Sequence, residues 1–250
     1  MIKPESLLFQ ILENNKEVYQ FYLQIRVSVY DPEEFVPLDE DVEETWIPFE
    51  IVDKSYLQKV VWVRDEYFII ETTDLAGNPL HITYWEFGGK EILRNLQSSR
   101  LFQPIDVEMP YLIFFTKHLP SLKLNLSKFG ISPFRVKLEQ QQNKNYYSLG
   151  IGGEKLLVDQ DTYHVVAMHS QIQIWGKDYL MIAKFSNWDS VKERIPLTTQ
   201  LFVNGRLFKE AQVNEIKFGG IRSKAQPLLK SYNRLFSANL DFDLDTKYGK

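Results

Sequence analysis

Alternation of apolar and polar residues, broken at short intervals by turn sequences, is the feature that most constrains the fold of this chain. From Phe21 to Val29 apolar side chains occupy every second position, which is the pattern of a strand with one buried face. Asn204-Gly205 lies between two alternating runs and is the strongest short hairpin signal in the sequence. The pattern predicts roughly ten or eleven strands in consecutive antiparallel hairpins, with the first ones at 21–29, 46–52, 56–63, 67–73 and 80–87 and the others within 131–219.

A meander of that length does not stay flat, because strand twist accumulates and unpaired edges favour aggregation. We therefore predict a mainly β fold with some α. The expected architecture is a long antiparallel meander curled into an incomplete, half-open β-barrel that a few helices cover.

The sequence favours one domain over residues 1–250, because no stretch has the composition of a flexible linker. Apolar residues at helical spacing after Pro4 predict a helix at the N-terminus. The expected segments are an N-terminal helix, a first strand block, a helical insert or lid, a second strand block, and a C-terminal helix with a polar tail, at 4–16, 17–87, 88–130, 131–219 and 220–250.

Composition excludes several classes of function. A formal net charge of −4 without a basic cluster argues against nucleic acid as a partner. The chain has no cysteine, which excludes thiolate nucleophiles, disulfides, iron–sulfur clusters and cysteine-type zinc sites. Apolar stretches such as Tyr111–Phe115 are too short to cross a bilayer. The N-terminus shows no export signal, which places the protein in the cytoplasm if Met1 is the true start.

Motifs that carry catalytic chemistry have simpler interpretations in this chain. His164 and His169 are five residues apart in an expected strand, so their side chains should point to opposite faces and cannot share a metal. Gly150–Gly153 precedes a strand and lacks the Gly-Lys-Ser/Thr ending of a phosphate loop, which favours a hairpin turn. Asp159 flanks a turn, where an aspartate usually accepts backbone hydrogen bonds. We predict no catalytic residues, no metal site and no cofactor.

Large apolar and aromatic residues are abundant on the expected strands: the chain has 17 Phe, 13 Tyr and 5 Trp. They can fill the interior as ordinary core, or they can line a wide, partly filled half-barrel that takes acyl chains under a helical lid. Both interpretations stay open at this point. For the second, strand alternation gives these candidate ligand-binding residues: Leu23, Ile25, Val27, Trp62, Phe68, Ile70, Ile82, Tyr84, Val136, Leu138, Leu149, Met168, Ile172 and Ile174.

The order of the expected elements is itself a distinctive pattern. A short helix runs into FYLQIRVSVYDP, the hairpins VVWVRDEYFIIETTDLAGNPL follow, and a helical insert precedes the second strand block. A later strand ends in an Asp-x-x-Thr turn at 158–162, and Ile195-Pro196 opens the last hairpin. Over residues 5–220 this pattern resembles the LolA-type outer-membrane lipoprotein-sorting superfamily.

The resemblance implies an unclosed antiparallel barrel whose apolar concave face holds lipid tails of lipoproteins, or another amphiphile, in the periplasm. It implies no catalysis, and it implies inner- or outer-membrane transport proteins as partners. Two rival functions remain. One is a cell-envelope interaction module with a filled core, which binds a protein through a strand edge or the acidic loop 38–44. The other is a small-ligand enzyme with dispersed acids at the barrel mouth.

Overall fold

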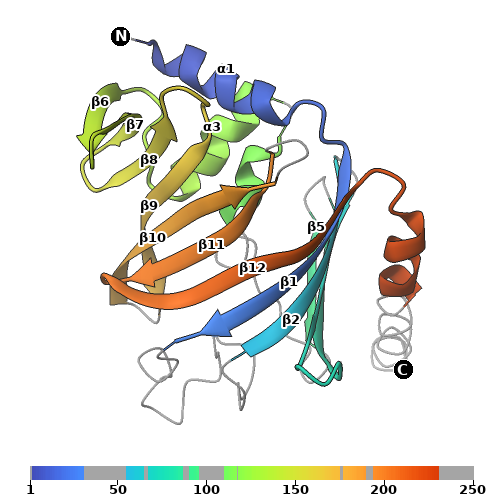
Figure 1. The fold of residues 1–250 in the computed structure, drawn as a ribbon. Coiled ribbons are helices and arrows are strands. Elements are labelled where there is room, and N and C mark those ends of the chain that lie inside the picture. Colours follow the sequence, from blue (N-terminus) through green and yellow to red (C-terminus); the bar gives the residue numbers. More distant parts are fainter. Residues whose placement is uncertain are drawn as a thin grey trace, which may run out of the picture. The chain divides into compact units, whose positions relative to one another are not determined.

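Figure 1 shows the fold in a computed structural model of the chain. The predicted strand at 46–52, the acidic loop 38–44 and the polar tail lie outside the part of the chain that the structure describes. That part comprises residues 2–30, 55–64, 67–86, 90–95, 110–116, 118–174, 177–189 and 194–230.

The N-terminal helix α1 spans Pro4–Asn15, which confirms the predicted helix. Its proline lies in the first turn, where the missing N–H costs no helical hydrogen bond. Leu7, Leu8, Ile11 and Leu12 recur at helical spacing, and all four are buried. The apolar face of the sequence is therefore the face that packs.

Strands make up most of the described chain. Those of the first block are β1 (Gln20–Val29), β2 (Ser55–Val63), β3 (Tyr67–Thr73), β4 (Pro79–Glu86) and β5 (Lys90–Asn95). Those of the second block are β6 (Val136–Gln141), β7 (Lys144–Ile151), β8 (Glu154–Asp159), β9 (Val165–Ile174), β10 (Lys177–Trp188), β11 (Pro196–Val203) and β12 (Arg206–Phe218).

These strands form one twelve-stranded sheet in the order β5-β4-β3-β2-β1-β12-β11-β10-β9-β8-β7-β6. Every strand pair with a described register is antiparallel. Strands that pair in the sheet are consecutive in the sequence, except that β1 pairs with β12. The order ends at β5 and β6 and does not close, so the predicted fold class of an unclosed antiparallel meander with a few helices is confirmed.

The predicted helical insert at 88–130 requires a correction, because it contains strand β5. The first strand block was predicted to end at residue 87, yet Lys90 lies opposite Glu86 and β4 and β5 are neighbours in the sheet. The helical part is limited to η2 (Pro110–Phe114) and α3 (Leu119–Lys128). Just after α3, Gly130 has φ +73°, a left-handed conformation that suits glycine at the end of a helix.

Two hairpin loops show why the strands follow one another so closely. Asn204 and Gly205 both have positive φ, at 47° and 82°, as the two central residues of a type I′ turn require. Gln142 and Asn143 form a second such loop, with φ of 49° and 62°. The sequence predicted the first loop.

The chain divides into two compact units, and β1 and β12 each contribute residues to both. The expectation of one domain stays a prediction. Unit 1 comprises Met1–Val18, Arg26–Ser55 and Pro104–Val213, and unit 2 comprises Tyr19–Ile25, Tyr56–Gln103 and Asn214–Lys250.

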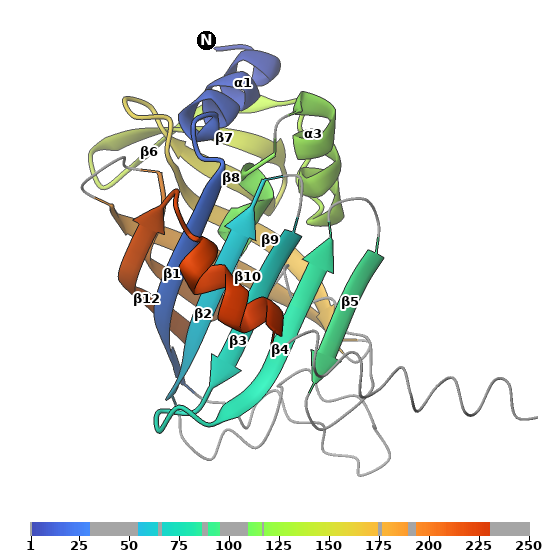
Figure 2. The same ribbon diagram turned by 90° about the vertical axis from the view of Figure 1, so that its right-hand side faces the viewer.

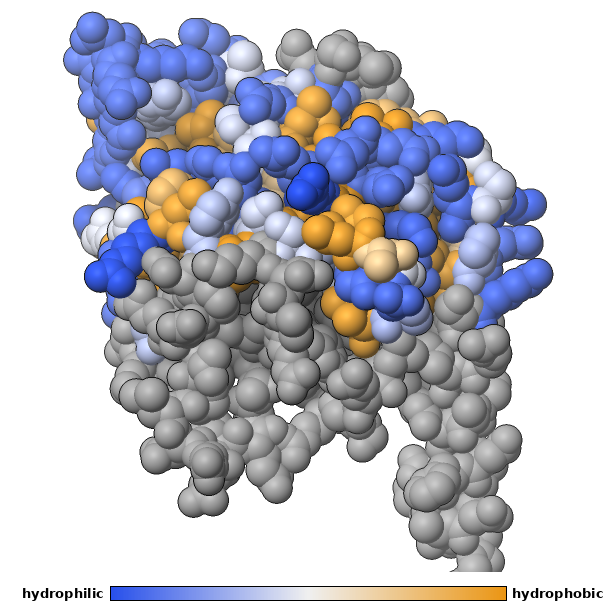
Figure 3. All heavy atoms as spheres, turned by 60° about the horizontal axis from the view of Figure 1, so that its bottom comes forward, coloured by the Kyte–Doolittle hydropathy of each residue, from blue (hydrophilic) through white to orange (hydrophobic). Residues whose placement is uncertain are grey.

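In unit 1, helices α1 and α3 and the short helix η2 pack against one another. Leu122 and Leu126 of α3 and Phe114 of η2 have no exposed surface. In unit 2, a C-terminal helix at 222–230 lies across the strands of the first block (Figure 2). Figure 3 shows one face of the molecule, on which apolar side chains form small groups among hydrophilic ones.

Candidate apolar binding face

One face of the unit 2 strands is built from large apolar side chains. Phe21 of β1 stacks on Trp62 of β2 with ring centroids 5.1 Å apart. Trp62 lies opposite Phe68 of β3. Val60, two residues before Trp62 on β2, lies opposite Ile70 of β3. We call this surface the unit 2 face; each of its side chains is 2% exposed or less, and its members are Phe21, Leu23, Ile25, Val60, Trp62, Phe68 and Ile70.

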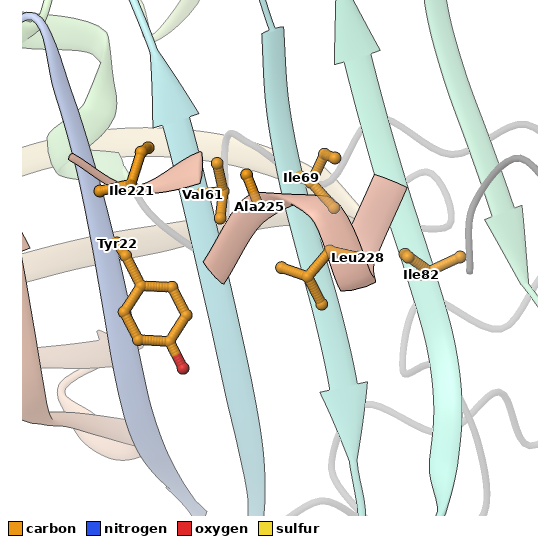
Figure 4. Packing of buried hydrophobic residues seen from close by; sticks show 7 residues of the cluster. All are labelled: Tyr22, Val61, Ile69, Ile82, Ile221, Ala225 and Leu228. Atoms are coloured by element: carbon orange, nitrogen blue, oxygen red, sulfur yellow. The ribbon is translucent and has the colours of Figure 1, made fainter. Parts of the chain in front are cut away.

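The opposite face of the same strands is covered by the C-terminal helix. Figure 4 shows Ile221, Ala225 and Leu228 pointing toward the strands. They pack on Tyr22, Val61, Ile69 and Ile82, which we call the helix-covered face. At the N-terminal end of the helix, the Lys224 ammonium pairs with Glu215 at 3.0 Å and lies 4.8 Å from the centroid of the Tyr22 ring.

The structure therefore separates the candidate residues of unit 2. Leu23, Ile25, Trp62, Phe68 and Ile70 come together on the unit 2 face. Ile82 does not join them, because it lies opposite Glu71 in the register and packs under the C-terminal helix. For Tyr84 only the register is described, opposite Ile69 of the helix-covered face.

Unit 1 carries a second apolar row that crosses five strands. Leu149 of β7 lies opposite Leu156 of β8, which in turn lies opposite Met168 of β9. Met168 lies opposite Ala183 of β10, and Ala183 lies opposite Leu201 of β11. All five side chains are buried. We call these residues the unit 1 row: Leu149, Leu156, Met168, Ala183 and Leu201.

The other candidate residues of unit 1 differ in their placement. Val27 of β1 is buried. Val136 lies opposite Leu149 at the end of the row and is half-buried, whereas Leu138 on the same strand is 52% exposed. For Ile172 and Ile174 only the register is described, opposite Tyr179 and Lys177.

Helix η2 covers part of the unit 1 sheet through one aromatic side chain. The Tyr111 ring meets the rings of Phe185 and Trp188 on β10 edge to face, with centroids 5.1 and 5.4 Å apart. Burial raises the pKa of the Tyr111 hydroxyl above its ordinary value, and a hydrogen bond with the Asn15 side chain opposes this shift. The hydroxyl is therefore a neutral anchor between η2 and the end of α1.

Several polar groups near these apolar surfaces have structural partners. The Gln58 amide donates to the Thr72 hydroxyl at 3.4 Å, in register on neighbouring strands. His164 stacks on Trp188 at 4.1 Å between ring centroids, away from His169 on β9. Burial and the nearby Lys155 lower the pKa of His169. Among the described residues no group of three or more His, Cys, Asp or Glu side chains could hold a metal.

The Asp-x-x-Thr turn works as the sequence predicts. One Asp159 carboxylate oxygen accepts the backbone N–H groups of Asp161 and Thr162, both at 3.0 Å, and the other pairs with the Lys144 ammonium at 2.6 Å. Burial alone would raise the pKa of Asp159, but these hydrogen bonds hold it below its ordinary value. The Asn14 amide donates to the Thr162 carbonyl at 3.0 Å and ties α1 to the turn.

Sequence reasoning missed several residues of these surfaces. Leu156, Ala183 and Leu201 complete the unit 1 row, and Val60 belongs to the unit 2 face. Val60 lies on β2 with the candidate Trp62, whereas β8, β10 and β11 supplied no candidate. The alternation that selected Leu149 and Met168 is the signal that could have found all four. The signal was present but the pairing partners were not known.

Comparison with solved structures supports the predicted fold. A LolA superfamily protein from Nitrosomonas europaea is similar with a TM-score of 0.51 at 13% identity, over 90% of this chain and 97% of that one. A domain from Vibrio parahaemolyticus, described as an outer membrane lipoprotein-sorting protein, gives 0.50 at 9% identity over 86% and 92%. No protein-family model and no curated protein sequence matches this chain. The predicted resemblance to the LolA-type superfamily is thus confirmed at the level of the fold.

No helix in the described ranges is long and apolar enough to cross a bilayer.

Proposed function

We propose that this protein is a non-catalytic periplasmic carrier that binds the acyl chains of lipoproteins or of another amphiphile on its apolar sheet faces. The observation that carries this proposal is the composition of the unit 2 face, where seven apolar side chains from three neighbouring strands form one surface. The described structural neighbours, whose names refer to LolA and to lipoprotein sorting, support it through their fold.

Such a face suits an acyl chain for a simple energetic reason. Each methylene that leaves water contributes about 0.8 kcal/mol, so a long chain binds tightly without polar contacts. Because the side chains of the unit 2 face are nearly completely buried, a ligand reaches them only when covering groups move aside. The carrier must therefore open to load its ligand.

A fluorescent fatty acid such as cis-parinaric acid tests the proposal. We expect saturable binding to the purified protein and displacement by lipoprotein or phospholipid acyl chains. Ile70 and Ile69 provide a matched pair of variants: they are neighbours on β3, both are 1% exposed or less, and they lie on opposite faces. Ile70→Thr should weaken binding about three- to tenfold, since it places a hydroxyl on the unit 2 face and removes apolar contact.

Ile69→Thr should destabilise the fold to a similar degree but leave the affinity within about twofold. Equal losses of affinity in the two variants would show that stability, not contact with the ligand, controls binding. Absence of fluorescent binding, together with no lipid in mass spectra of protein purified from an envelope fraction, would rule out the carrier.

The second candidate is an envelope interaction module with a filled core. It is favoured by the near-complete burial of the unit 1 row and the unit 2 face, since side chains packed at core density leave no space for a ligand. The fatty-acid binding experiment and the mass spectra distinguish the two candidates, because an interaction module binds no fatty acid and carries no lipid.

A further inference from the structure

Strand β6 lies at one end of the sheet order, and within the described ranges no strand pairs with its outer side. Its inner side pairs with β7. The Gly150 N–H donates to the Arg135 carbonyl at 3.0 Å, and the two-residue loop at 142–143 closes the other end of the ladder. Hydrogen-bonded positions alternate along an antiparallel strand. Odd-numbered residues of β6 therefore bond to β7, and Val136, Leu138 and Gln140 direct their N–H and C=O groups outward.

Exposed apolar side chains gather along this edge. Leu138 is 52% exposed, and Phe134, just before β6, is 71% exposed. Ile151 on β7 is 49% exposed, and the backbone bond from Gly150 to Arg135 places it beside Phe134. The α3 side chain Lys123 lies 5.9 Å from the centroid of the Phe134 ring. An edge that is both unpaired and apolar is a template for another strand.

The charges of β6 identify which strand fits. On the face opposite Leu138, the Lys137 ammonium pairs with Glu139 at 2.8 Å, and Lys155 of β8 binds the same carboxylate at 2.8 Å. A second copy of β6, laid antiparallel and centred on Leu138, brings Leu138 opposite Leu138. Each Lys137 then faces the second copy's Glu139, and opposite charges directly across a strand pair are stabilising.

Neighbouring registers lack this complementarity. Residues whose N–H and C=O groups point outward must pair with residues of the same kind in the second copy. The second copy of β6 can therefore shift along the first only in steps of two positions. One such shift sets Lys137 against the second copy's Lys137, and the other sets Glu139 against Glu139. Like charges directly opposite are destabilising. The sequence of β6 is therefore self-complementary in one antiparallel register.

We propose that β6 is a dimerisation edge, through which two copies of this chain pair antiparallel about Leu138 and join their sheets. This inference does not depend on the proposed carrier function. Three pairs of residues, with Leu138 at the centre, would exchange about six backbone hydrogen bonds. Because the contact is one short strand wide, the dimer should be weak and reversible, with a dissociation constant in the micromolar range.

Single cysteines test the register, since the chain contains no native cysteine. In the proposed dimer the two Leu138 Cα atoms lie about 5.5 Å apart, within the range of a disulfide. Two copies of Phe134 are eight positions apart along the strand, or roughly 26 Å. Under mild oxidation we expect Leu138→Cys to cross-link at least tenfold more than Phe134→Cys, although Phe134 is the more exposed residue.

Equal cross-linking of the two variants, or none in Leu138→Cys, would overturn the proposed pairing. If β6 pairs instead with an extended segment of another protein, Leu138→Cys would not cross-link to a second copy of this chain.

Sedimentation velocity between about 10 and 300 µM tests the association itself. Wild type should shift from monomer to dimer, and Lys137→Glu should weaken the dimer at least tenfold, since it sets Glu against Glu139. Arg135→Glu makes the same change of charge two residues away, opposite the second copy's Gln141, and should change the dissociation constant no more than about twofold. Leu138→Pro removes an outward N–H, leaves the bonds to β7 intact, and should abolish dimers.

Circular dichroism melting confirms that each variant is folded before its association is compared. A wild type that stays monomeric over the whole range, or equal effects of Lys137→Glu and Arg135→Glu, would refute the dimerisation edge.

Discussion

The fold requires glycine at position 150. It lies within β7 at φ +138°, and a Cβ added there would lie 2.3 Å from the Glu154 carbonyl oxygen. Only glycine combines that backbone conformation with that approach. Gly150→Ala should lower the free energy of unfolding by about 2–4 kcal/mol in urea titrations. Gly153→Ala is the control, because nothing lies within 4 Å of a Cβ there; equal losses in both variants would contradict this explanation.

Glu139 gives the protein a defined sensitivity to acid. Burial acts to raise the pKa of the Glu139 carboxyl, but hydrogen bonds from Lys137 and Lys155 outweigh it and lower the pKa from 4.5 to about 2. A depressed pKa in the folded state means that the stabilisation is complete above about pH 4.5 and is lost as the pH falls toward 2.

Glu139→Gln should therefore be about 1–3 kcal/mol less stable than wild type at pH 7, and the difference should shrink toward zero near pH 2. Urea denaturation of dilute protein across this pH range measures it. A difference that stays constant with pH would mean that the charge of Glu139 does not contribute.

At the scale of elements, the C-terminal helix depends on its packing. Its described residues, 222–230, pack Ala225 and Leu228 on the helix-covered face, and most helical stability in proteins comes from such packing of an apolar face. Leu228→Ala should lower stability by about 2–4 kcal/mol and speed hydrogen exchange of the helix amides. Gln226→Ala, at an exposed position of the same helix, should do neither. Unchanged exchange in Leu228→Ala would show that other contacts hold the helix.

At the scale of the whole molecule, one sheet serves both units through β1 and β12. The fatty-acid experiment asks whether the buried apolar faces become available to a ligand. A carrier must open and therefore binds at a free-energy cost, while an interaction module keeps its core closed. The wild-type protein and the Ile69 and Ile70 variants together separate these behaviours.

The sequence by itself determined the strands, most of their turns and the unclosed antiparallel class, because alternation and loop residues such as Asn204-Gly205 are local signals. It also correctly assigned Asp159 to a turn and Gly150–Gly153 to a hairpin. It missed β5, because the first strand block was predicted to end at residue 87, and one more strand follows there.

Only the tertiary structure decided which apolar residues share a face. β4 carries Ile82 at a position that alternation alone cannot assign, and pairing with β3 sets it opposite Glu71 and beneath the C-terminal helix. The pairing of β2 with β3 brings Trp62, Phe68 and Ile70 together on the other side. A strand with apolar residues on both sides has no preferred face of its own. Its register against a neighbouring strand, fixed by contacts distant in sequence, makes the choice.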